Sequence, residues 1–479
     1  MITISRRLAS QLRSVLRRAF GNFRGTGPAV GFIAGKEGLI ARSSFGDVAV
    51  ECRLPGDRPP EALWLPFEFL ADVAGKNDEP VDLESSGDGQ ISVQWRTGNV
   101  PQIVKYDVKE PLTDKFPVLP TAFTANRVGL LQALHEASEV ADPDSGRFSI
   151  NCIQLCPGGT INATDGRHLL MQSGFTFPWQ KPVLVPRSKV FTSPELPQDQ
   201  PVAVAQSGDW AVVSAGRWTI YLRINEGSYP DVSRHVLDPN TATARCQFSK
   251  DDIRFLVETL PQLPCDEATN FPVTIDLNGS IAIRAKAADQ DKPTEVILTN
   301  SRWTGEPIRI NINRTYLQRA MKLGIRDLCL YGDSSPLSGL DSEMRYVWMP
   351  LDGGSAIPPA DDAVRIESPQ GEIAASPATT IPKPVTPKKA PPMSEPTNTN
   401  GKATSSGKAE TSEQAKTETA NPKASRRKAA LQDLAALIDD AEKLRTAAHV
   451  LVQGLKQHRR QNRVMQQTID QIRTLKLGV

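Results

Sequence analysis

With 479 residues, the chain is too long for a single hydrophobic core, and its length predicts about three domains. Hydrophobic residues make up 39% and charged residues 23%, as in ordinary globular proteins, and no apolar run reaches the roughly 18–20 residues of a membrane-spanning helix. The net charge of +2 is unevenly spread, because residues 421–479 carry 12 Lys and Arg against 5 Asp and Glu, which leaves residues 1–420 net negative. The sequence therefore excludes a helical membrane protein and a chain that holds nucleic acid by positive charge throughout.

The N-terminal stretch ISRRLASQLRSVLRRAF predicts an amphipathic helix, whose apolar face holds Leu8, Leu12, Val15, Leu16 and Ala19. Arg6, Arg13 and Arg17 lie together on the opposite face, and no acidic residue interleaves with them. Such a row suits the phosphates of any DNA sequence, so we predict DNA contact there instead of an ordinary solvated face. An Arg-rich stretch without acidic residues also fits a transit peptide, an alternative that the internal repeats argue against.

Three stretches of the chain open alike, with a short strand, a polar cap and an amphipathic helix, starting at Met1, Thr121 and Ala244. A second strand–helix unit begins near the middle of each stretch, at Ala62, Pro182 and Pro307. Runs with strand periodicity follow the helices, and the sequences SGDW and AGRW predict hairpin turns. We therefore predict an α+β fold of three tandem domains, each internally duplicated, over residues 1–120, 121–240 and 241–352.

The composition changes after the third domain. Residues 353–425 are rich in Pro, Ser, Thr, Ala and Lys and hold almost no large apolar residues, so we predict a disordered linker. A 3,4 spacing of apolar residues runs from Leu434 to Ile472, with the polar residues His458 and Asn462 at two of its positions. For residues 426–479 this spacing predicts a long helix, which either docks on the body or pairs in a coiled coil.

The sequence offers no recognisable catalytic or metal-binding motif. A Walker loop, an HExxH motif, a nucleophile elbow and a two-metal carboxylate set are all absent, so we expect no enzymatic activity, no cofactor and no metal. Asp165 and His168 are close enough in sequence for a dyad, but no nucleophile accompanies them. The six cysteines are scattered and contain no CxxC pair, which favours a reducing cytoplasmic setting.

The segment NATDGRHLLMQ predicts two strands joined by a tight turn at Asp165-Gly166. Together with VLVPRSKV (183–190), EGSYPDVSRHVL (226–237), ININRTYL (310–317) and YVWMPL (346–351), it resembles the beta subunit of bacterial DNA polymerase III, the DNA sliding clamp. The resemblance implies three domains of doubled βαβββ units. It also implies a homodimer, in which two subunits close head-to-tail into a ring with helices on its inner wall.

The same resemblance implies a non-catalytic processivity factor on the nucleoid, which encircles double-stranded DNA and binds polymerase and clamp-loader subunits. In the family, a TDGHRL segment and a C-terminal MPMRL segment form a hydrophobic pocket for a short peptide that carries Gln and Leu or Phe. The matching positions here are Ile150, Thr164, Gly166, Arg167, His168, Leu169, Val347, Met349, Pro350 and Leu351. Arg24 matches a DNA-contacting loop arginine of the family, and Arg187 and Arg314 on other predicted helices are further candidates for phosphate contact.

Three features depart from the family pattern. The His-Arg order is reversed to Arg167-His168, the chain continues for 128 residues past Leu351, and the other predicted helices are less uniformly basic than the first. The alternative to a replicative clamp is therefore a divergent clamp-fold scaffold or paralogue whose coiled-coil tail recruits partners. Within that tail, residues 432–437 loosely resemble a clamp-binding peptide, although they also fit the first turns of the heptad helix.

Overall fold

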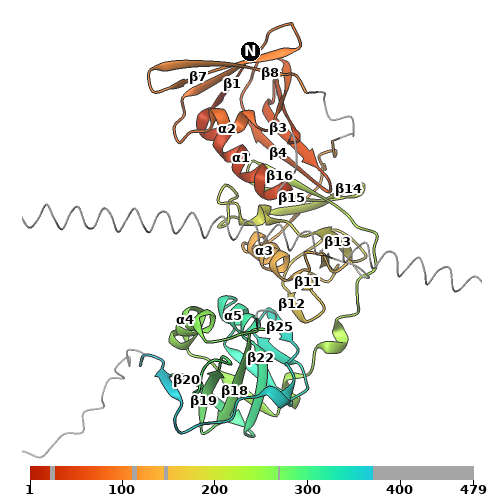
Figure 1. Ribbon diagram of the computed structural model, residues 1–479. Helices are drawn as coiled ribbons and strands as arrows, with labels where there is room; N and C mark the ends of the chain where they lie inside the picture. Colours follow the sequence, from red (N-terminus) through yellow and green to blue (C-terminus); the bar gives the residue numbers. More distant parts are fainter. Residues whose placement is uncertain (22–26, 110–115, 145–148, 268–269, 371–479) are drawn as a thin grey trace, which may run out of the picture. The chain divides into compact units, whose positions relative to one another are not determined.

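The computed structural model describes residues 1–21, 27–109, 116–144, 149–267 and 270–370. Within these ranges the chain forms three repeats with nearly the same order of strands and helices (Figure 1). Arg24, residues 371–425 of the predicted linker and the whole predicted coiled-coil helix lie outside the described residues. None of the helices described is long and apolar enough to cross a membrane.

The first repeat covers residues 2–107 and consists of a strand, a helix and three strands, twice over. Its first half contains β1 (Ile2–Ser5), α1 (Arg6–Phe20), β2 (Ala29–Gly35), β3 (Gly38–Phe45) and β4 (Val48–Leu54). Its second half contains β5 (Glu61–Pro66), α2 (Phe69–Val73), β6 (Pro80–Ser85), β7 (Gln90–Thr97) and β8 (Val100–Asp107).

The second repeat covers residues 124–223 and has the same order, with a 3-10 turn in place of the second helix. Its first half contains β9 (Thr124–Ala125), α3 (Leu130–Val140), β10 (Cys152–Leu155), β11 (Ile161–Thr164) and β12 (His168–Gln172). Its second half contains β13 (Val183–Pro186), η1 (Lys189–Thr192), β14 (Ala203–Ser207), β15 (Trp210–Ala215) and β16 (Trp218–Arg223). Two short 3-10 turns, η2 (Ser233–His235) and η3 (Pro239–Thr241), lead to the third repeat.

The third repeat covers residues 244–348 and has one strand more than the others. Its first half contains β17 (Ala244–Gln247), α4 (Lys250–Thr259), η4 (Leu260–Gln262), β18 (Pro272–Asn278), β19 (Ser280–Ala285), β20 (Thr294–Leu298) and the additional β21 (Arg302–Gly305). Its second half contains β22 (Ile308–Asn313), α5 (Arg314–Lys322), β23 (Asp327–Leu330), β24 (Leu337–Leu340) and β25 (Met344–Trp348). Five of the six predicted strand–helix openings are thus confirmed, because α1, α2, α3, α4 and α5 each follow an opening strand. The opening predicted at Pro182 has its strand, β13, but only the 3-10 turn η1 in place of the helix.

The two halves of each repeat exchange their opening strands. β1 pairs with β6 of the second half, whereas β5 pairs with β2 of the first half. The same exchange joins β9 to β14 and β13 to β10, and it joins β17 to β23 and β22 to β18. Each opening strand therefore completes a four-stranded antiparallel unit whose other three strands come from the opposite half.

Neighbouring repeats are joined edge to edge by antiparallel strand pairing. β4 of the first repeat pairs with β16 of the second over five residue pairs, which creates an eight-stranded sheet. β12 of the second repeat pairs with β25 of the third, also over five residue pairs, which creates a nine-stranded sheet. These junctions satisfy the backbone N–H and C=O groups that the edge strands of separate repeats would leave unpaired.

Local sequence explains where α1 begins and which face it buries. The Ser5 hydroxyl oxygen caps the helix by accepting a hydrogen bond from the Leu8 backbone N–H (3.1 Å). The helix ends at Gly21, whose φ of +67° is unfavourable for residues with a side chain. The predicted apolar face is confirmed, because the structure buries Leu8, Leu12, Val15, Leu16 and Ala19.

The two predicted hairpin turns of the second repeat are also confirmed. Gly208-Asp209 joins β14 to β15, and Gly216-Arg217 joins β15 to β16. Both glycines have positive φ angles, +54° and +59°, as two-residue hairpin turns require.

The chain beyond the third repeat contradicts one prediction. The sequence predicts a disordered linker from residue 353, but residues 353–370 contain the 3-10 turn η5 (Gly353–Ser355) and the strand β26 (Val364–Glu367). β26 pairs in parallel with β20 and becomes the fifth strand of its sheet. The linker prediction is therefore wrong for residues 353–370. The strand could not be recognised from composition, because the alternation of Val364 and Ile366 spans only four residues beside a polar, Pro-rich stretch.

The burial of α1 generates a stability prediction. Leu12 is 1% exposed, so Leu12→Ala should remove buried apolar contacts and lower the free energy of unfolding by about 2–5 kcal/mol. Guanidinium denaturation followed by circular dichroism measures this loss as a shift of the unfolding midpoint. Arg17→Ala on the exposed side of the same helix is the control and should change stability by less than about 0.5 kcal/mol. Equal shifts for the two variants would contradict the packing described here.

Candidate peptide pocket and nucleic-acid interface

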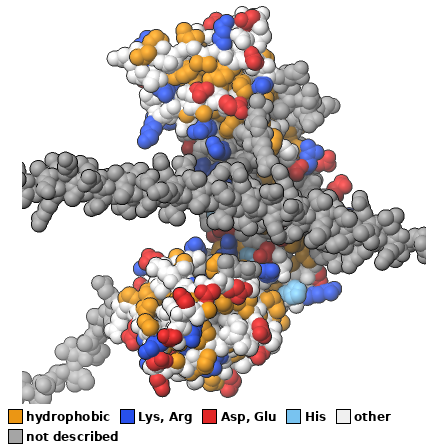
Figure 2. Space-filling view, in the orientation of Figure 1, with side chains coloured by type: hydrophobic (Ala, Val, Ile, Leu, Met, Phe, Trp, Pro, Cys, Tyr) orange, Lys and Arg blue, Asp and Glu red, His pale blue; other side chains and the backbone are white. Residues whose placement is uncertain are grey.

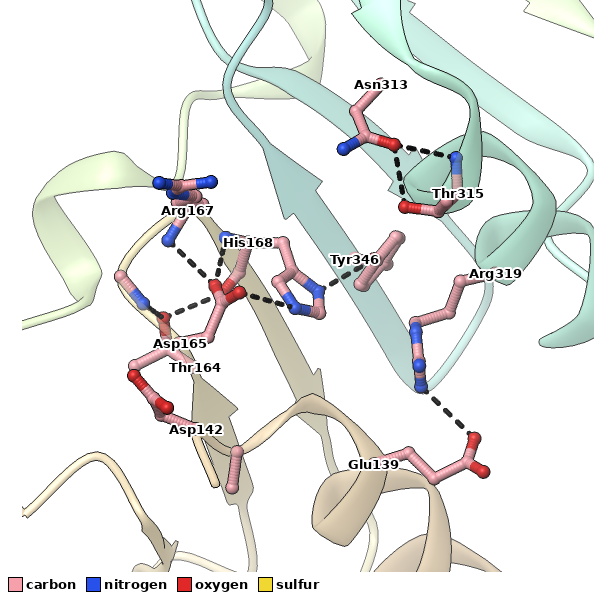
Figure 3. Close-up of polar contacts among 12 residues, drawn as sticks. Glu139, Asp142, Thr164, Asp165, Arg167, His168, Asn313, Thr315, Arg319 and Tyr346 are labelled. Carbon is pink, nitrogen blue, oxygen red and sulfur yellow. Dashed lines mark hydrogen bonds and ion pairs between the residues drawn. The ribbon is translucent and has the colours of Figure 1, made fainter. Parts of the chain in front are cut away.

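The turn between β11 and β12 is held by its own side chains (Figure 3). The Thr164 hydroxyl donates to the His168 carbonyl oxygen (2.6 Å) and accepts from the Gly166 N–H (3.0 Å). The Asp165 carboxylate accepts from the backbone N–H groups of Arg167 (2.8 Å) and His168 (3.0 Å). Gly166 has a φ of +87°, which favours glycine at this position. The predicted Asp165-Gly166 turn is therefore confirmed.

The buried imidazole of His168 connects this turn to the third repeat. Its Nε2 lies 3.2 Å from Asp165 Oδ2, and its Nδ1 lies 2.7 Å from the Tyr346 hydroxyl (Figure 3). The ring also stacks on Tyr316 of α5, with the ring centroids 4.5 Å apart. Burial raises the pKa of Tyr346 well above its usual value, so its hydroxyl keeps its proton and can donate to Nδ1. Nε2 then carries the imidazole proton and faces the carboxylate.

The Asp165 carboxylate is ionised, which suits it to accept hydrogen bonds from the His168 ring and from the backbone of the turn. Burial acts to raise the pKa of its carboxyl group. The hydrogen bond from the His168 side chain, together with the backbone N–H groups of His168 and Arg167, outweighs burial and holds the pKa below its usual value. The cluster therefore orients the turn against the third repeat.

A pocket of about 550 Å³ opens beside the β12–β25 junction. Leu169 pairs with Val347 across the junction, and both side chains are buried at its floor. Its lining residues are Ile150, Thr164, Gly166, Arg167, His168, Leu169, Pro230, Asp231, Val232, Arg234, His235, Leu237, Pro336, Val347, Trp348 and Met349. The volume falls within the roughly 300–1,000 Å³ of ligand pockets, and an apolar lining with a few polar groups is typical of such sites.

The structure brings together eight of the ten predicted pocket residues. Pro350 and Leu351 do not line the pocket, because the chain turns away there and the Leu351 N–H donates to the Asn311 carbonyl oxygen of β22 (2.8 Å). The prediction missed the wall formed by residues 230–237. Those residues belong to the segment EGSYPDVSRHVL, which supported the family resemblance without being assigned to the pocket.

The exposed side of α1 carries two of the predicted DNA-contacting arginines. Arg17 is exposed and Arg13 is half-buried, with no ion pair to either among the described residues. The Nε of Arg13 also lacks a hydrogen-bond partner in the part of the chain that the structure describes. Figure 2 shows Lys and Arg side chains gathered beside α1. Arg24 follows α1 in sequence but lies outside the described residues.

Arg6 does not belong to this exposed row, and its predicted phosphate contact is wrong. Its side chain is only 14% exposed and donates to the carbonyl oxygens of Val73 (3.2 Å), Ala74 (3.2 Å) and Arg96 (2.7 Å). Val73 and Ala74 form the C-terminal end of α2, where carbonyl groups lack helical partners. Arg6 satisfies these groups and is therefore a structural residue.

Arg314 and Arg187, like Arg6, each donate hydrogen bonds to carbonyl oxygens near the end of a neighbouring helix. Arg314 is 3% exposed, and its guanidinium donates to the carbonyl oxygens of Leu260 (3.1 Å), Leu263 and Pro264 (3.2 Å), beyond the end of α4. The prediction that Arg314 contacts DNA is therefore wrong. Arg187 is half-buried and donates to the Ala141 carbonyl oxygen at the end of α3 (3.1 Å).

The position of Arg314 generates a second prediction. Arg314→Ala should leave three partly buried carbonyl groups without this donor and lower the free energy of unfolding by about 2–4 kcal/mol. Thermal unfolding followed by calorimetry measures the loss. Lys322→Ala removes an exposed cation from the same helix and serves as the control. An Arg314→Ala variant as stable as this control would show that the buried guanidinium is not needed for folding.

Solved structures of known proteins share this arrangement of repeats. The DNA polymerase III subunit beta from Pseudomonas aeruginosa matches at 20% identity with a TM-score of 0.60, over 73% of this chain and 99% of its own. The beta subunit from Streptococcus pyogenes matches at 16% identity and 0.62, with the same coverage. The DNA polymerase sliding clamp from Bacillus subtilis matches at 16% identity and 0.61, over 73% of this chain and 98% of its own.

At the level of sequence, no family model and no curated protein matches the chain. The structural matches nevertheless span nearly the whole length of each solved clamp. The chain therefore has the fold of the bacterial DNA polymerase III beta subunits, the sliding clamps.

Proposed function

We propose that the chain is a DNA sliding clamp, a non-catalytic ring subunit that encircles duplex DNA. The observation that carries this proposal is the pair of edge-to-edge junctions, β4–β16 and β12–β25, which join three clamp-fold repeats in series. Two copies would supply six repeats, which could close head-to-tail into a homodimeric ring. The proteins with this fold are described as DNA polymerase III beta subunits and sliding clamps, which supports a role in DNA replication or repair in the cytoplasm.

In the proposed ring, DNA is held by topology, and strong affinity for a particular sequence would hinder sliding. A few contacts between arginines and phosphates are sufficient, because the closed ring keeps both at high effective concentration. Arg13 and Arg17 are suited to such contacts, since α1 buries its opposite face and contains no acidic residue. Their interaction with DNA is expected to depend on salt and to be independent of base sequence.

We further propose that the pocket beside the β12–β25 junction binds a short peptide of a DNA polymerase or clamp loader. Leu169, Val347 and Met349 offer apolar contacts for a Leu or Phe side chain. Polar groups of Arg167, Asp231 and His235 also line the pocket and can orient a Gln side chain. One ring would then carry two such pockets and could tether two partners to the same DNA.

The DNA proposal predicts that Arg13→Glu combined with Arg17→Glu lowers retention on circular duplex DNA by about ten-fold or more, because both phosphate contacts become repulsive. Gel filtration of clamp loaded on a circular plasmid measures retention, and linearising the plasmid should release the unmodified chain. Lys36→Glu combined with Lys181→Glu makes the same change in charge at exposed positions outside α1 and is the control. Unchanged retention of the α1 variant would count against DNA contact through this helix.

The pocket proposal predicts that Met349→Lys weakens binding of a fluorescent peptide containing Gln, Leu and Phe by about ten-fold or more, since a charge would enter the apolar contact. Met349 is 43% exposed, so the substitution should leave the fold intact. Val128→Lys alters another exposed apolar residue, which does not line the pocket, and is the control. Fluorescence anisotropy gives both affinities, and equal binding by the two variants would remove the support for a peptide site here.

A further inference from the structure

The closing strands of the six half-repeats have different partners. Each half-repeat ends its three-stranded run with one closing strand: β4, β8, β12, β16, β20 or β25. Four of these pair with one another inside the chain, as β4–β16 and β12–β25. β8 is the last strand of its sheet, whereas β20 pairs with β26, a strand that belongs to no repeat. By analogy with the two internal junctions, β8 of one copy and β20 of another would form the contact between subunits.

The segment that follows the third repeat, residues 352–370, is named here the strap. It begins against two strands of the sheet that contains β20. The Asn311 amide donates to the Ser355 hydroxyl oxygen (2.6 Å), and the Ile357 N–H donates to the Thr274 hydroxyl oxygen (2.8 Å). These contacts connect the first part of the strap to β22 and β18, so the strap remains attached even where its later part is free to move.

The later part of the strap occupies the edge of β20. The Val364 N–H donates to the Pro293 carbonyl oxygen, and the Ser368 N–H donates to the Ile297 carbonyl oxygen, both at 2.9 Å. The Thr299 N–H donates to the Ser368 hydroxyl oxygen, and the Thr299 hydroxyl donates to the Ser368 carbonyl oxygen, both at 2.9 Å. Ser368 is 3% exposed. The backbone groups that an approaching strand would use on β20 are therefore already engaged by the same chain.

A row of charges crosses this sheet and ends on the strap. The Glu295 side chain of β20 is 3% exposed, and its two oxygens are divided between two arginines. Arg284 Nε lies 2.7 Å from Oε1, and Arg365 Nε lies 2.7 Å from Oε2. Arg365 is 59% exposed, so it satisfies the second oxygen from the solvent side. Departure of β26 would leave this oxygen in need of another cation or water.

β26 pairs less extensively than the two junctions between repeats. It makes four residue pairs in the parallel direction, whereas each junction makes five pairs in the antiparallel direction. All four of its residues are exposed, so it buries little apolar surface. β8, in contrast, is eight residues long and exposes Val100, Ile103 and Val104 at the end of its sheet. Such an edge favours pairing with another strand.

We propose that β26 covers in cis the edge of β20 to which β8 of a second copy binds, so that ring closure requires the strap to leave this edge. This inference rests on the proposed ring. If β26 stayed in place, it would lie between β20 of one copy and β8 of the other. These two strands would then be about 4.8 Å further apart than the paired strands of the two internal junctions, which contain no inserted strand. Because the strap stays attached through residues 355–357, it competes with the second copy as an intramolecular strand of high effective concentration.

The test compares full-length chains in which ten residues are replaced by Gly and Ser. The variant carries the replacement at residues 361–370, and the control carries it at residues 371–380. Sedimentation over a range of protein concentrations measures self-association, and amide hydrogen exchange of residues 100–107 reports whether β8 is covered. The variant should associate about ten-fold or more tightly than the control, with protection of residues 100–107 that rises with protein concentration.

Two further variants keep the test specific. Arg365→Glu should also strengthen association, because it places a second carboxylate beside Glu295 and weakens the strap without removing it. Ile103→Lys, added to the chain with the replaced strap, should cancel the gain, since Ile103 is 64% exposed on β8 and the new charge would enter the contact. Association that strengthens without protection of residues 100–107 would assign it to another surface and overturn the proposal.

The two proposals fail in different ways. If the control and the variant associate equally well, with equal protection of residues 100–107, the ring remains supported and the strap does not control it. If residues 100–107 stay unprotected in every chain, and circular DNA is not retained, the ring proposal itself fails and the strap proposal fails with it.

Discussion

The pairing of backbone groups at sheet edges is the constraint on which this structure depends. A three-stranded run leaves a row of N–H and C=O groups at each side, and these groups need partners. One side is completed by the opening strand of the opposite half-repeat, as β1 completes the sheet of β6 and β5 completes that of β2. In four of the six half-repeats the other side is completed by the neighbouring repeat, through β4–β16 and β12–β25. The same type of bond thus builds each repeat and connects the repeats.

The candidate peptide pocket is a product of one of these junctions. Leu169 and Val347 become neighbours only because β12 and β25 pair in this register. His168 supports the register, since its ring contacts Asp165 of the turn, Tyr346 of β25 and Tyr316 of α5. The reversed order of Arg167 and His168 has a simple structural reading: the buried position holds the imidazole, which fits between two tyrosines, while the guanidinium lines the pocket.

The sequence predicted the repeats well because similar local signals recur along the chain. Ser5 and Ser249 cap the helices that follow β1 and β17, and glycines with positive φ mark the hairpins.

Predictions for single arginines were less successful. Helical spacing placed Arg6 beside Arg13 and Arg17, but it could not reveal that the end of α2 lies next to Arg6. Arg187 and Arg314 follow the opening strands β13 and β22 in the same way, and both donate to carbonyl groups near the end of another helix. Only the tertiary structure distinguishes such residues from a solvent-facing cation. The wall of the pocket at residues 230–237 was missed for a similar reason, since its only regular element is the short 3-10 turn η2 and it reaches the pocket only in the folded chain.

The exchange of opening strands has a consequence for how the chain folds. β1 pairs with a strand that begins about 75 residues later, so Ile2 meets Leu83 only after most of the first repeat has been synthesised. Neither half can complete its own sheet, and each repeat must therefore fold as one cooperative unit. Contacts between residues so distant in sequence slow folding, because a long loop has to close before they form. During translation, the apolar face of α1 therefore has no completed sheet to pack against until the second half of the first repeat has left the ribosome.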